Sequence, residues 1–308
     1  MNNDLILSVS PHIRSNITTR RIMLDVVISL LPAAIAGTLI FGIRSLAVIA
    51  VCVASAVISE YLFNKAAKKP NTITDLSAVV TGLLLSLNLP ANTPLWQAAV
   101  GAAFAIIFVK CVFGGIGQNF ANPAITARIF MLVAFGSMSS AAFPKNIDAV
   151  SGATPLAVLQ NGGEVKITDL LLGTRGGSIG ETCTVALIIG GLYLLFRRVI
   201  SWHTPVIFVA TVFLFTFAVK GDAFTALEYT LSGGLFIGAI FMATDYATTP
   251  VTKWGKVIFG ISAGLLTVLI RLWGVYPEGV SFAILLMNIL TPYIDKWTAK
   301  KPFGGEIK

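Results

Sequence analysis

The chain has 308 residues, of which 56% are hydrophobic and 12% are charged, and its mean hydropathy is +0.84. Soluble domains carry roughly 25% charged residues, so this composition excludes a soluble domain and indicates a membrane protein. The formal net charge is +8, but no basic patch interleaved with aromatic residues occurs. Membrane topology therefore explains the positive charge better than nucleic-acid binding does.

The predicted elements begin after a polar N-terminal segment that lacks the hydrophobic region of a cleaved signal peptide. Ten hydrophobic segments predict an all-α polytopic membrane protein with about ten membrane-spanning helices. These predicted spans are 24–42, 46–64, 76–90, 96–113, 124–138, 184–197, 204–219, 231–247, 257–274 and 280–295. Several are shorter than the roughly 20 residues of a straight crossing, so they must be tilted, extended or broken inside the bundle.

The distribution of positive charge predicts the topology. If the N-terminus lies in the cytoplasm, most of the 22 Lys and Arg residues fall in cytoplasmic segments. With ten spans, both termini are then cytoplasmic. Because five spans precede the polar interval at 139–181, that interval is predicted to lie outside the cytoplasm.

The two sets of five spans show a faint internal repeat. Asn119-Phe-Ala121 corresponds to Ser281-Phe-Ala283, and Leu87-Asn-Leu-Pro90 corresponds to Ala247-Thr-Thr-Pro250 at nearly the same offset. An odd number of helices per repeat forces the two repeats into opposite orientations, so the repeat is inverted. In inverted-repeat folds, short or interrupted helices at matching positions flank the central site, which points to the third and eighth spans.

These observations predict five regions along the chain. They are a cytoplasmic N-terminal segment at 1–23, a first five-helix repeat at 24–138, an extracytoplasmic loop at 139–181, a second five-helix repeat at 182–298 and a cytoplasmic tail at 299–308.

The extracytoplasmic loop contains a hydroxyl group that is placed for modification. The small residues Ser151, Gly152 and Ala153 leave the Thr154 hydroxyl exposed in the same loop as Asp148. No histidine or other general base lies nearby in the sequence, so self-activation of this hydroxyl as a nucleophile is not expected. The arrangement favours an external enzyme that attaches a group to Thr154.

Asp148-x-x-Ser151-Gly152-Ala153-Thr154 resembles the motif at which a flavin transferase links FMN to threonine through its phosphate. Together with segments 75–90, 113–128 and 241–256, it makes the chain similar to the family of the Rnf complex D subunits and the sodium-pump B subunits. The resemblance covers essentially the whole chain. It extends to the run Gly177-Ser-Ile-Gly-Glu181.

The resemblance implies a subunit of the Rnf ferredoxin:NAD oxidoreductase in the inner (cytoplasmic) membrane, with covalent FMN on Thr154. It implies electron transfer between ferredoxin and NAD coupled to Na⁺ or H⁺ translocation, the other Rnf subunits (A, B, C, E and G) as partners, and a flavin transferase for maturation. The related pump subunit adds a further implication, which is a second flavin, riboflavin, inside the bundle.

Two glycine-rich segments are candidates for flavin binding. Between the fourth and fifth spans, Gln118, Asn119 and Asn122 supply amide groups for the ring or ribityl chain, or else they satisfy the backbone of a re-entrant turn. The second segment, before the sixth span, contains Arg175, Gly176, Gly177 and Ser178. Its backbone N–H groups and its guanidinium group suit the phosphate or the ring of a flavin. Alternatively, the segment forms a helix-capping turn.

Asp245 and Asp75 are candidates for an ion pathway, because acids near membrane depth are often functional. Asp245 is equally well explained as a surface carboxylate that balances Lys253. The cysteines have no CxxC spacing and are interpreted as small buried side chains, and no metal site is predicted.

Two other functions fit the predicted architecture. A passive channel or transporter for a small polar solute can be built on inverted five-helix repeats, but it has no use for a flavin-attachment motif. A scaffold without a cofactor of its own would leave the amide and arginine segments unexplained.

Overall fold

The computed structural model describes residues 17–135, 142–143, 154–163, 165–274 and 279–299. These residues form helices and loops, and their single β-type contact is an isolated bridge between Ala142 and Gly177. The prediction of an all-helical chain is therefore confirmed. Helices suit a membrane environment because they satisfy their backbone hydrogen bonds internally.

The first half of the chain contains two long helices followed by shorter ones. They are α1 (Thr19–Phe41), α2 (Ile43–Ala66), the 3₁₀ turn η1 (Ile73–Asp75), α3 (Ser77–Leu87), α4 (Leu95–Phe104), its π-helical continuation η2 (Ala105–Cys111) and α5 (Pro123–Ala134). Gly42 alone separates α1 from α2, and its φ of 84° lets the chain turn sharply there. Each of the five predicted spans of this half overlaps one of these helices.

The second half begins with two short helices in the polar interval, α6 (Pro155–Gln160) and α7 (Ile167–Leu172). The remaining elements are α8 (Thr184–Phe196), α9 (His203–Lys220), α10 (Ala223–Leu231), α11 (Leu235–Ile237), its π-helical continuation η5 (Gly238–Met242), α12 (Lys253–Trp273) and α13 (Val280–Thr298). The five predicted spans of this half also overlap helices.

The bounds of the eighth predicted span, 231–247, are wrong. The helix there, α11 with η5, covers only 235–242, and it forms a pair with α10 that bends by 66° at Ser232–Gly234. Gly233 has a φ of 67°, which a glycine adopts without strain. Helix α10 was not among the predicted spans, because Glu228 and two threonines, Thr225 and Thr230, interrupt its hydrophobic pattern.

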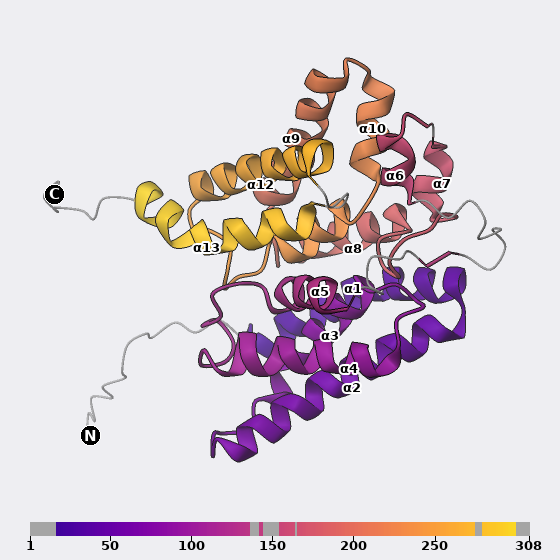
Figure 1. Ribbon diagram of the computed structural model, residues 1–308. Coiled ribbons are helices and arrows are strands. Elements are labelled where there is room, and N and C mark those ends of the chain that lie inside the picture. The colour runs from indigo at the N-terminus through magenta and orange to yellow at the C-terminus, as the bar shows by residue number, and fades with distance from the viewer. Residues whose placement is uncertain (1–16, 136–141, 144–153, 164, 275–278, 300–308) are drawn as a thin grey trace, which may run out of the picture.

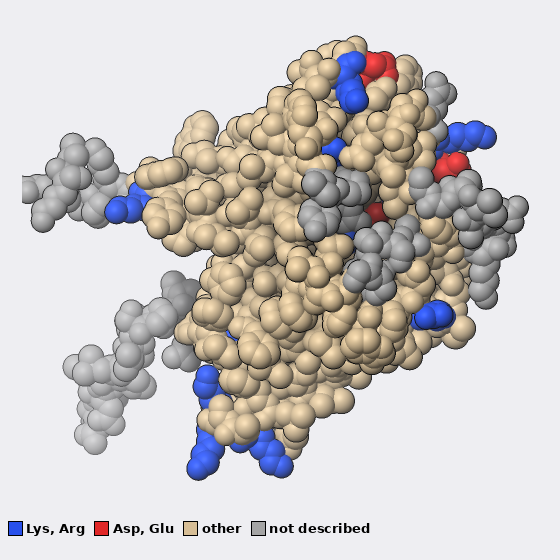
Figure 2. Space-filling view, in the orientation of Figure 1, with Lys and Arg blue, Asp and Glu red and all other residues tan. Residues whose placement is uncertain are grey.

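Within the described residues, four helices are long and apolar enough to cross a membrane, and the bent pair makes a fifth candidate. These four are α1, α2, α9 and α12. Shorter apolar helices, namely α3, α4 with η2, α5 and α8, pack among them. In Figure 2 most of the visible surface is uncharged, and Lys and Arg gather at its edges. The structure therefore supports a multi-pass membrane protein.

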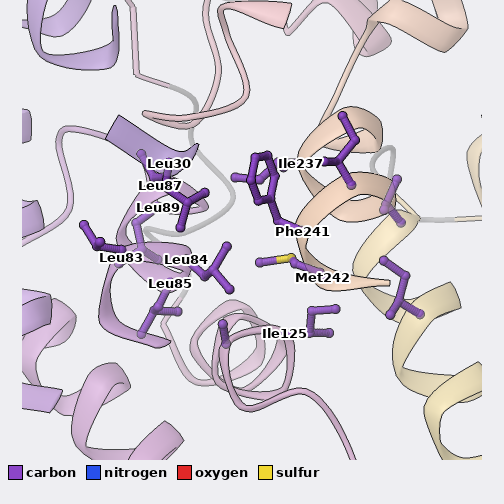
Figure 3. Packing of buried hydrophobic residues seen from close by; sticks show 14 of the residues in the cluster. Leu30, Leu83, Leu84, Leu85, Leu87, Leu89, Ile125, Ile237, Phe241 and Met242 are labelled. Atoms are coloured by element: carbon purple, nitrogen blue, oxygen red, sulfur yellow. The ribbon is translucent and has the colours of Figure 1, made fainter. Parts of the chain in front are cut away.

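The two halves of the chain lie against each other (Figure 1), with α1 packed on α8 and α5 packed on α13. Gly190 of α8 lies so close to α1 that an added Cβ atom would lie 2.1 Å from the carbonyl oxygen of Ser29. Figure 3 shows leucines of α3 facing Phe241 and Met242 of η5 across the contact between the halves. The short, interrupted helices therefore meet in the centre of the molecule.

Candidate functional site

Thr154 is the N-cap residue of α6. Its Oγ1 accepts a hydrogen bond from the backbone N–H of Ala157 at 3.3 Å, and its side chain is half-buried. The structure thus places this hydroxyl at a helix terminus. The other residues of the predicted motif lie outside the described residues: Asp148, Ser151, Gly152 and Ala153.

Arg175 lies in the loop between α7 and α8, where it is only 5% exposed. Its Nη2 donates to the carbonyl oxygens of Glu181 at 3.0 Å and Leu231 at 3.1 Å. Burial lowers the pKa of Arg175, and the nearby Glu181 carboxylate acts in the opposite direction. The sequence suggested an anion-binding loop or a helix-capping turn, and the structure buries this guanidinium group against the end of α10.

The neighbouring residues of this loop are held by short-range contacts. Ser178 Oγ donates to Glu181 Oε2 at 2.5 Å, and the Gly177 N–H donates to the Ala142 carbonyl at 3.0 Å. An added Cβ atom at Gly176 would lie 2.2 Å from the ring of Phe143, so only glycine fits there. These contacts pack Gly176 and Gly177 against the segment that contains Ala142 and Phe143.

A second buried arginine, Arg271 of α12, approaches the same helix break. Its Nη1 donates to the Tyr229 carbonyl, and its Nη2 donates to the Ser232 carbonyl at 3.0 Å. The last carbonyls of α10 have no partner within the helix, so the two guanidinium groups cap them and complement the negative end of the helix dipole. Arg271 lies within the predicted span 257–274, and the sequence pattern gave no sign of this capping role.

Several buried polar atoms around this break have no hydrogen-bond partner within the described residues. They are Nε and Nη1 of Arg175, Oγ of Ser232, Oγ1 of Thr182 and Oη of Tyr229. Buried donors without partners are rare, and a group of them indicates a missing water or ligand. Leu156 of α6 lies against Gly233 in the break, which places the helix capped by Thr154 beside these donors. The break therefore holds donors that suit hydrogen-bond acceptors, and α6 lies beside it.

A cavity lies elsewhere, between the two halves of the chain. Its volume is about 330 Å³, and its walls come from α1, α3, η2, the 116–124 segment, α8 and the 241–247 segment. The walls are mostly apolar, and their polar side chains are Thr19, Ser77, Thr81, Lys110, Asn119, Asn122, Thr244, Asp245 and Tyr246. An apolar cavity with a few convergent polar groups, at the low end of the roughly 300–1,000 Å³ range, suits a small organic ligand.

The amide residues of the 114–123 segment have different positions. Asn119 and Asn122 line the cavity, whereas Gln118 is exposed and its side chain folds over Gly114. Asn122 also caps α5, because its Oδ1 accepts from the N–H of Ala124 at 3.0 Å. Asn122 therefore satisfies backbone groups at the start of α5 and also lines the cavity.

The predicted flavin-binding residues do not converge on one cavity. Asn119 and Asn122 line the cavity between the halves, but Thr154 and the Arg175–Ser178 segment do not. The structure thus separates the predicted set into two places. One is the cavity, and the other is the helix break beside α6.

The two predicted ion-pathway acids also lie apart. Asp245 lines both the 330 Å³ cavity and a smaller one of about 160 Å³, and its Oδ2 lies 3.2 Å from Thr248 Oγ1. Asp75 instead accepts from the N–H of Ser77 at 2.8 Å at the start of α3. The position of Asp245 between two cavities is consistent with an ion pathway, whereas Asp75 holds a helix start.

One pair of buried charges was not predicted from the sequence. Glu60 of α2 and Lys110 of η2 are 1% and 3% exposed, and Lys110 Nζ lies 2.8 Å from Glu60 Oε1. Lys110 lies within the predicted span 96–113, where it interrupts an apolar run. A charge within an apolar segment is the signal that would have identified this pair.

Comparison with known proteins gives one family for nearly the whole chain. The family model described as NQR2, RnfD, RnfE matches residues 6–304. The chain is 48% identical over 307 residues to the D subunit of the Na⁺-translocating ferredoxin:NAD⁺ oxidoreductase complex of Acetobacterium woodii, covering 98% of this chain and 96% of the relative. It is 44% identical over 320 residues to the D subunit of the proton-translocating ferredoxin:NAD⁺ oxidoreductase complex of Clostridium ljungdahlii, covering 98% and 97%. It is also 35% identical to the D subunit of an ion-translocating oxidoreductase complex of Actinobacillus succinogenes, covering 97% of each chain.

Proposed function

The chain belongs to the NQR2, RnfD, RnfE family, and on that basis we propose that it is the D subunit of an ion-translocating ferredoxin:NAD⁺ oxidoreductase complex. The similarity over 98% of the chain to relatives of that name carries this proposal. In this role the protein passes electrons within the inner (cytoplasmic) membrane between ferredoxin and NAD⁺, coupled to ion translocation. Its partners are the other subunits of the complex, A, B, C, E and G.

The proposal includes FMN linked through its phosphate to Thr154 by a flavin transferase. Support comes from the motif around Thr154 and from the unpartnered donors of Arg175 and Ser232 at the neighbouring helix break. A flavin supplies the exchange of electrons singly or in pairs, while the protein supplies position and electrostatics. Thr154 would hold the phosphate, and Arg175 would donate to acceptor atoms of the cofactor.

The cavity between the halves would hold a second flavin, riboflavin. Its mostly apolar walls suit the face of a ring, and Asn119 and Asn122 supply amide groups for polar atoms. Because this cavity does not include Thr154, it would serve a ligand other than the covalent FMN.

Asp245 is the better candidate of the two acids for an ion pathway, because it lies in the walls of both cavities, whereas Asp75 is engaged at the start of α3. The relatives leave the coupling ion open, since the name of one specifies Na⁺ and the name of another specifies protons.

The proposed architecture is two inverted five-helix repeats with cytoplasmic termini and with the Thr154 loop outside the cytoplasm. The contacts of α1 with α8 and of α5 with α13 pair the first helices and the last helices of the two repeats, as a twofold axis would. In Figure 1 the ends of α2 and α13 lie at the left, whereas α6 and α7 lie at the opposite side.

The test of the covalent link is a Thr154→Val variant, co-expressed with a flavin transferase. We expect flavin fluorescence of the denatured protein in a gel for the unmodified chain, and its loss in the variant, because valine has no hydroxyl to esterify. Thr168→Val, an exposed threonine in the neighbouring helix α7, is the matched control and should keep the fluorescence. Fluorescence that persists in Thr154→Val would show that another residue carries the flavin. Mass spectrometry of the peptide that contains Thr154 would measure the added FMN directly.

A further inference from the structure

A buried ion pair forms part of the wall of the cavity between the halves. Lys110 Nζ donates to Glu60 Oε1 at 2.8 Å and to Ser77 Oγ at 2.6 Å. Lys110 and Ser77 both line the cavity, whereas Glu60 does not. The residue that carries the positive charge of the pair therefore forms part of the wall around the space in which a ligand would lie.

The backbone is arranged to place Lys110 there. Residues 105–111 form the π-helical segment η2, in which the N–H of Val112 bonds to the carbonyl of Ile107. Such segments are rare and occur frequently at functional sites. A buried ion pair is also weak as a source of stability, since removing two charges from water offsets most of their attraction. Stability alone is thus a poor explanation for a lysine at this position.

The partners of Lys110 are themselves fixed by hydrogen bonds. Thr72 Oγ1 donates to Glu60 Oε1 at 2.6 Å, and Asn64 Nδ2 donates to Thr72 Oγ1 at 3.0 Å. Ser77 Oγ donates to Asp75 Oδ1. Asp75 and Thr72 thus position the two groups that orient the ammonium ion, and this gives Asp75 an indirect connection to the cavity.

The ammonium group retains a donor for a ligand. It carries three N–H groups, of which Glu60 and Ser77 occupy two within the part of the chain that the structure describes. Asp245 also lines this cavity. A ligand that gains negative charge is stabilised beside the Lys110 ammonium group.

We propose that Lys110 compensates the charge of a redox-active ring bound in this cavity, with Glu60 and Ser77 as its positioning residues. The inference rests on the proposed function, in which this ring is riboflavin. A ring that takes up two electrons from reduced ferredoxin, an iron–sulfur protein, and one proton from water gains one negative charge. No bond to the protein forms or breaks, and the Lys110 ammonium group stabilises the added charge.

This role predicts that two variants shift the midpoint potential of the bound ring in opposite directions. Glu60→Gln removes the carboxylate that offsets the ammonium group, so it should favour the reduced ring. The double variant Glu60→Gln/Lys110→Met removes both charges and leaves no buried carboxylate unpaired, so it should disfavour the reduced ring relative to Glu60→Gln. A residue with a merely structural role would not produce shifts of opposite direction.

The experiment titrates riboflavin bound to the purified full-length chain by spectroelectrochemistry, in a Thr154→Val background that removes the covalent flavin. We expect the midpoint potential to rise in Glu60→Gln. Between that variant and the double variant, the reduction equilibrium constant should fall by at least tenfold, which is about 30 mV for two electrons. Lys65→Met, an exposed lysine of α2, should leave the potential unchanged.

Riboflavin fluorescence quenching measures binding in the same samples and shows whether each variant keeps its cavity. Riboflavin binding with the same midpoint potential in every variant would overturn the role of Lys110. A potential of the double variant above that of Glu60→Gln would overturn it as well. Either result would leave the second flavin in place. If the Thr154→Val chain binds no riboflavin, the proposal of a second flavin fails, and the inference about Lys110 fails with it.

Discussion

The buried charged side chains of this protein are each held by specific partners. Glu60 and Lys110 form an ion pair, whereas Arg175 and Arg271 donate to backbone carbonyls at the end of α10. A buried charge without a partner is strongly unfavourable, so each of these residues depends on its neighbours. Removing one member of such a pair should therefore lower the free energy of unfolding more than removing both members does.

We expect Lys110→Met to lower the free energy of unfolding by about 3–5 kcal/mol, because it leaves the Glu60 carboxylate buried without its counter-charge. The double variant Glu60→Gln/Lys110→Met should recover most of this loss. The measurement is thermal unfolding of the purified chain in detergent. Lys65→Met is the control, since Lys65 is exposed on the same helix as Glu60. Equal losses in the single and double variants would contradict a coupled pair.

The short helices in the centre of the molecule end where arginine side chains satisfy their carbonyls. At the end of α3, Nη1 of Arg128 donates to the carbonyl oxygen of Asn88, and it lies 3.2 Å from Asn88 Oδ1. At the end of α10, Arg175 and Arg271 have the same role. Inside a membrane protein, the last carbonyls of an interrupted helix have little water to bond, so side chains must replace it.

Arg128→Met should lower the free energy of unfolding by about 1–3 kcal/mol, because it leaves a buried carbonyl without a donor. The melting temperature in detergent is the measurement. Arg20→Met, at the exposed start of α1, is the matched control and should have little effect. An unchanged melting temperature for Arg128→Met would mean that water reaches the end of α3.

At the scale of the whole molecule, the positive charges gather at one end of the first half. Figure 2 shows Lys and Arg at the lower left, where Figure 1 places the end of α2, and the exposed lysines there are Lys65, Lys68 and Lys69. Such a cluster marks the cytoplasmic side of a membrane protein. The helix that follows Thr154 lies at the other side of the picture, in agreement with the proposed topology.

The topology can be tested with single cysteines in a chain whose native Cys52, Cys111 and Cys183 are replaced by alanine. We expect a membrane-impermeant thiol reagent to label Asn161→Cys in cells whose inner membrane is intact. Lys69→Cys should be labelled only after permeabilisation, because the proposed topology places it on the cytoplasmic side. Both positions are exposed, so accessibility within the protein does not limit labelling. Labelling of both positions from the same side would contradict the inverted arrangement.

Much of the fold follows from local sequence. Each hydrophobic segment became a helix because apolar runs and their polar ends are properties of consecutive residues. The bounds of α8 and α9, for example, differ from the predicted spans by one residue at one or both ends. The break at Ser232–Gly234 was visible as glycines, but the helix before it was missed because polar residues interrupt its apolar run.

Local patterns of residues were enough to establish a helical membrane protein, the positions of its main helices and its family. Which charges are buried, and which side chains share a cavity, became known only from the way the helices pack. The physical reason is that burial and pairing depend on segments far apart in the chain. Glu60 meets Lys110 across 50 residues, and Asn88 meets Met242 across 154. No run of consecutive residues specifies such contacts.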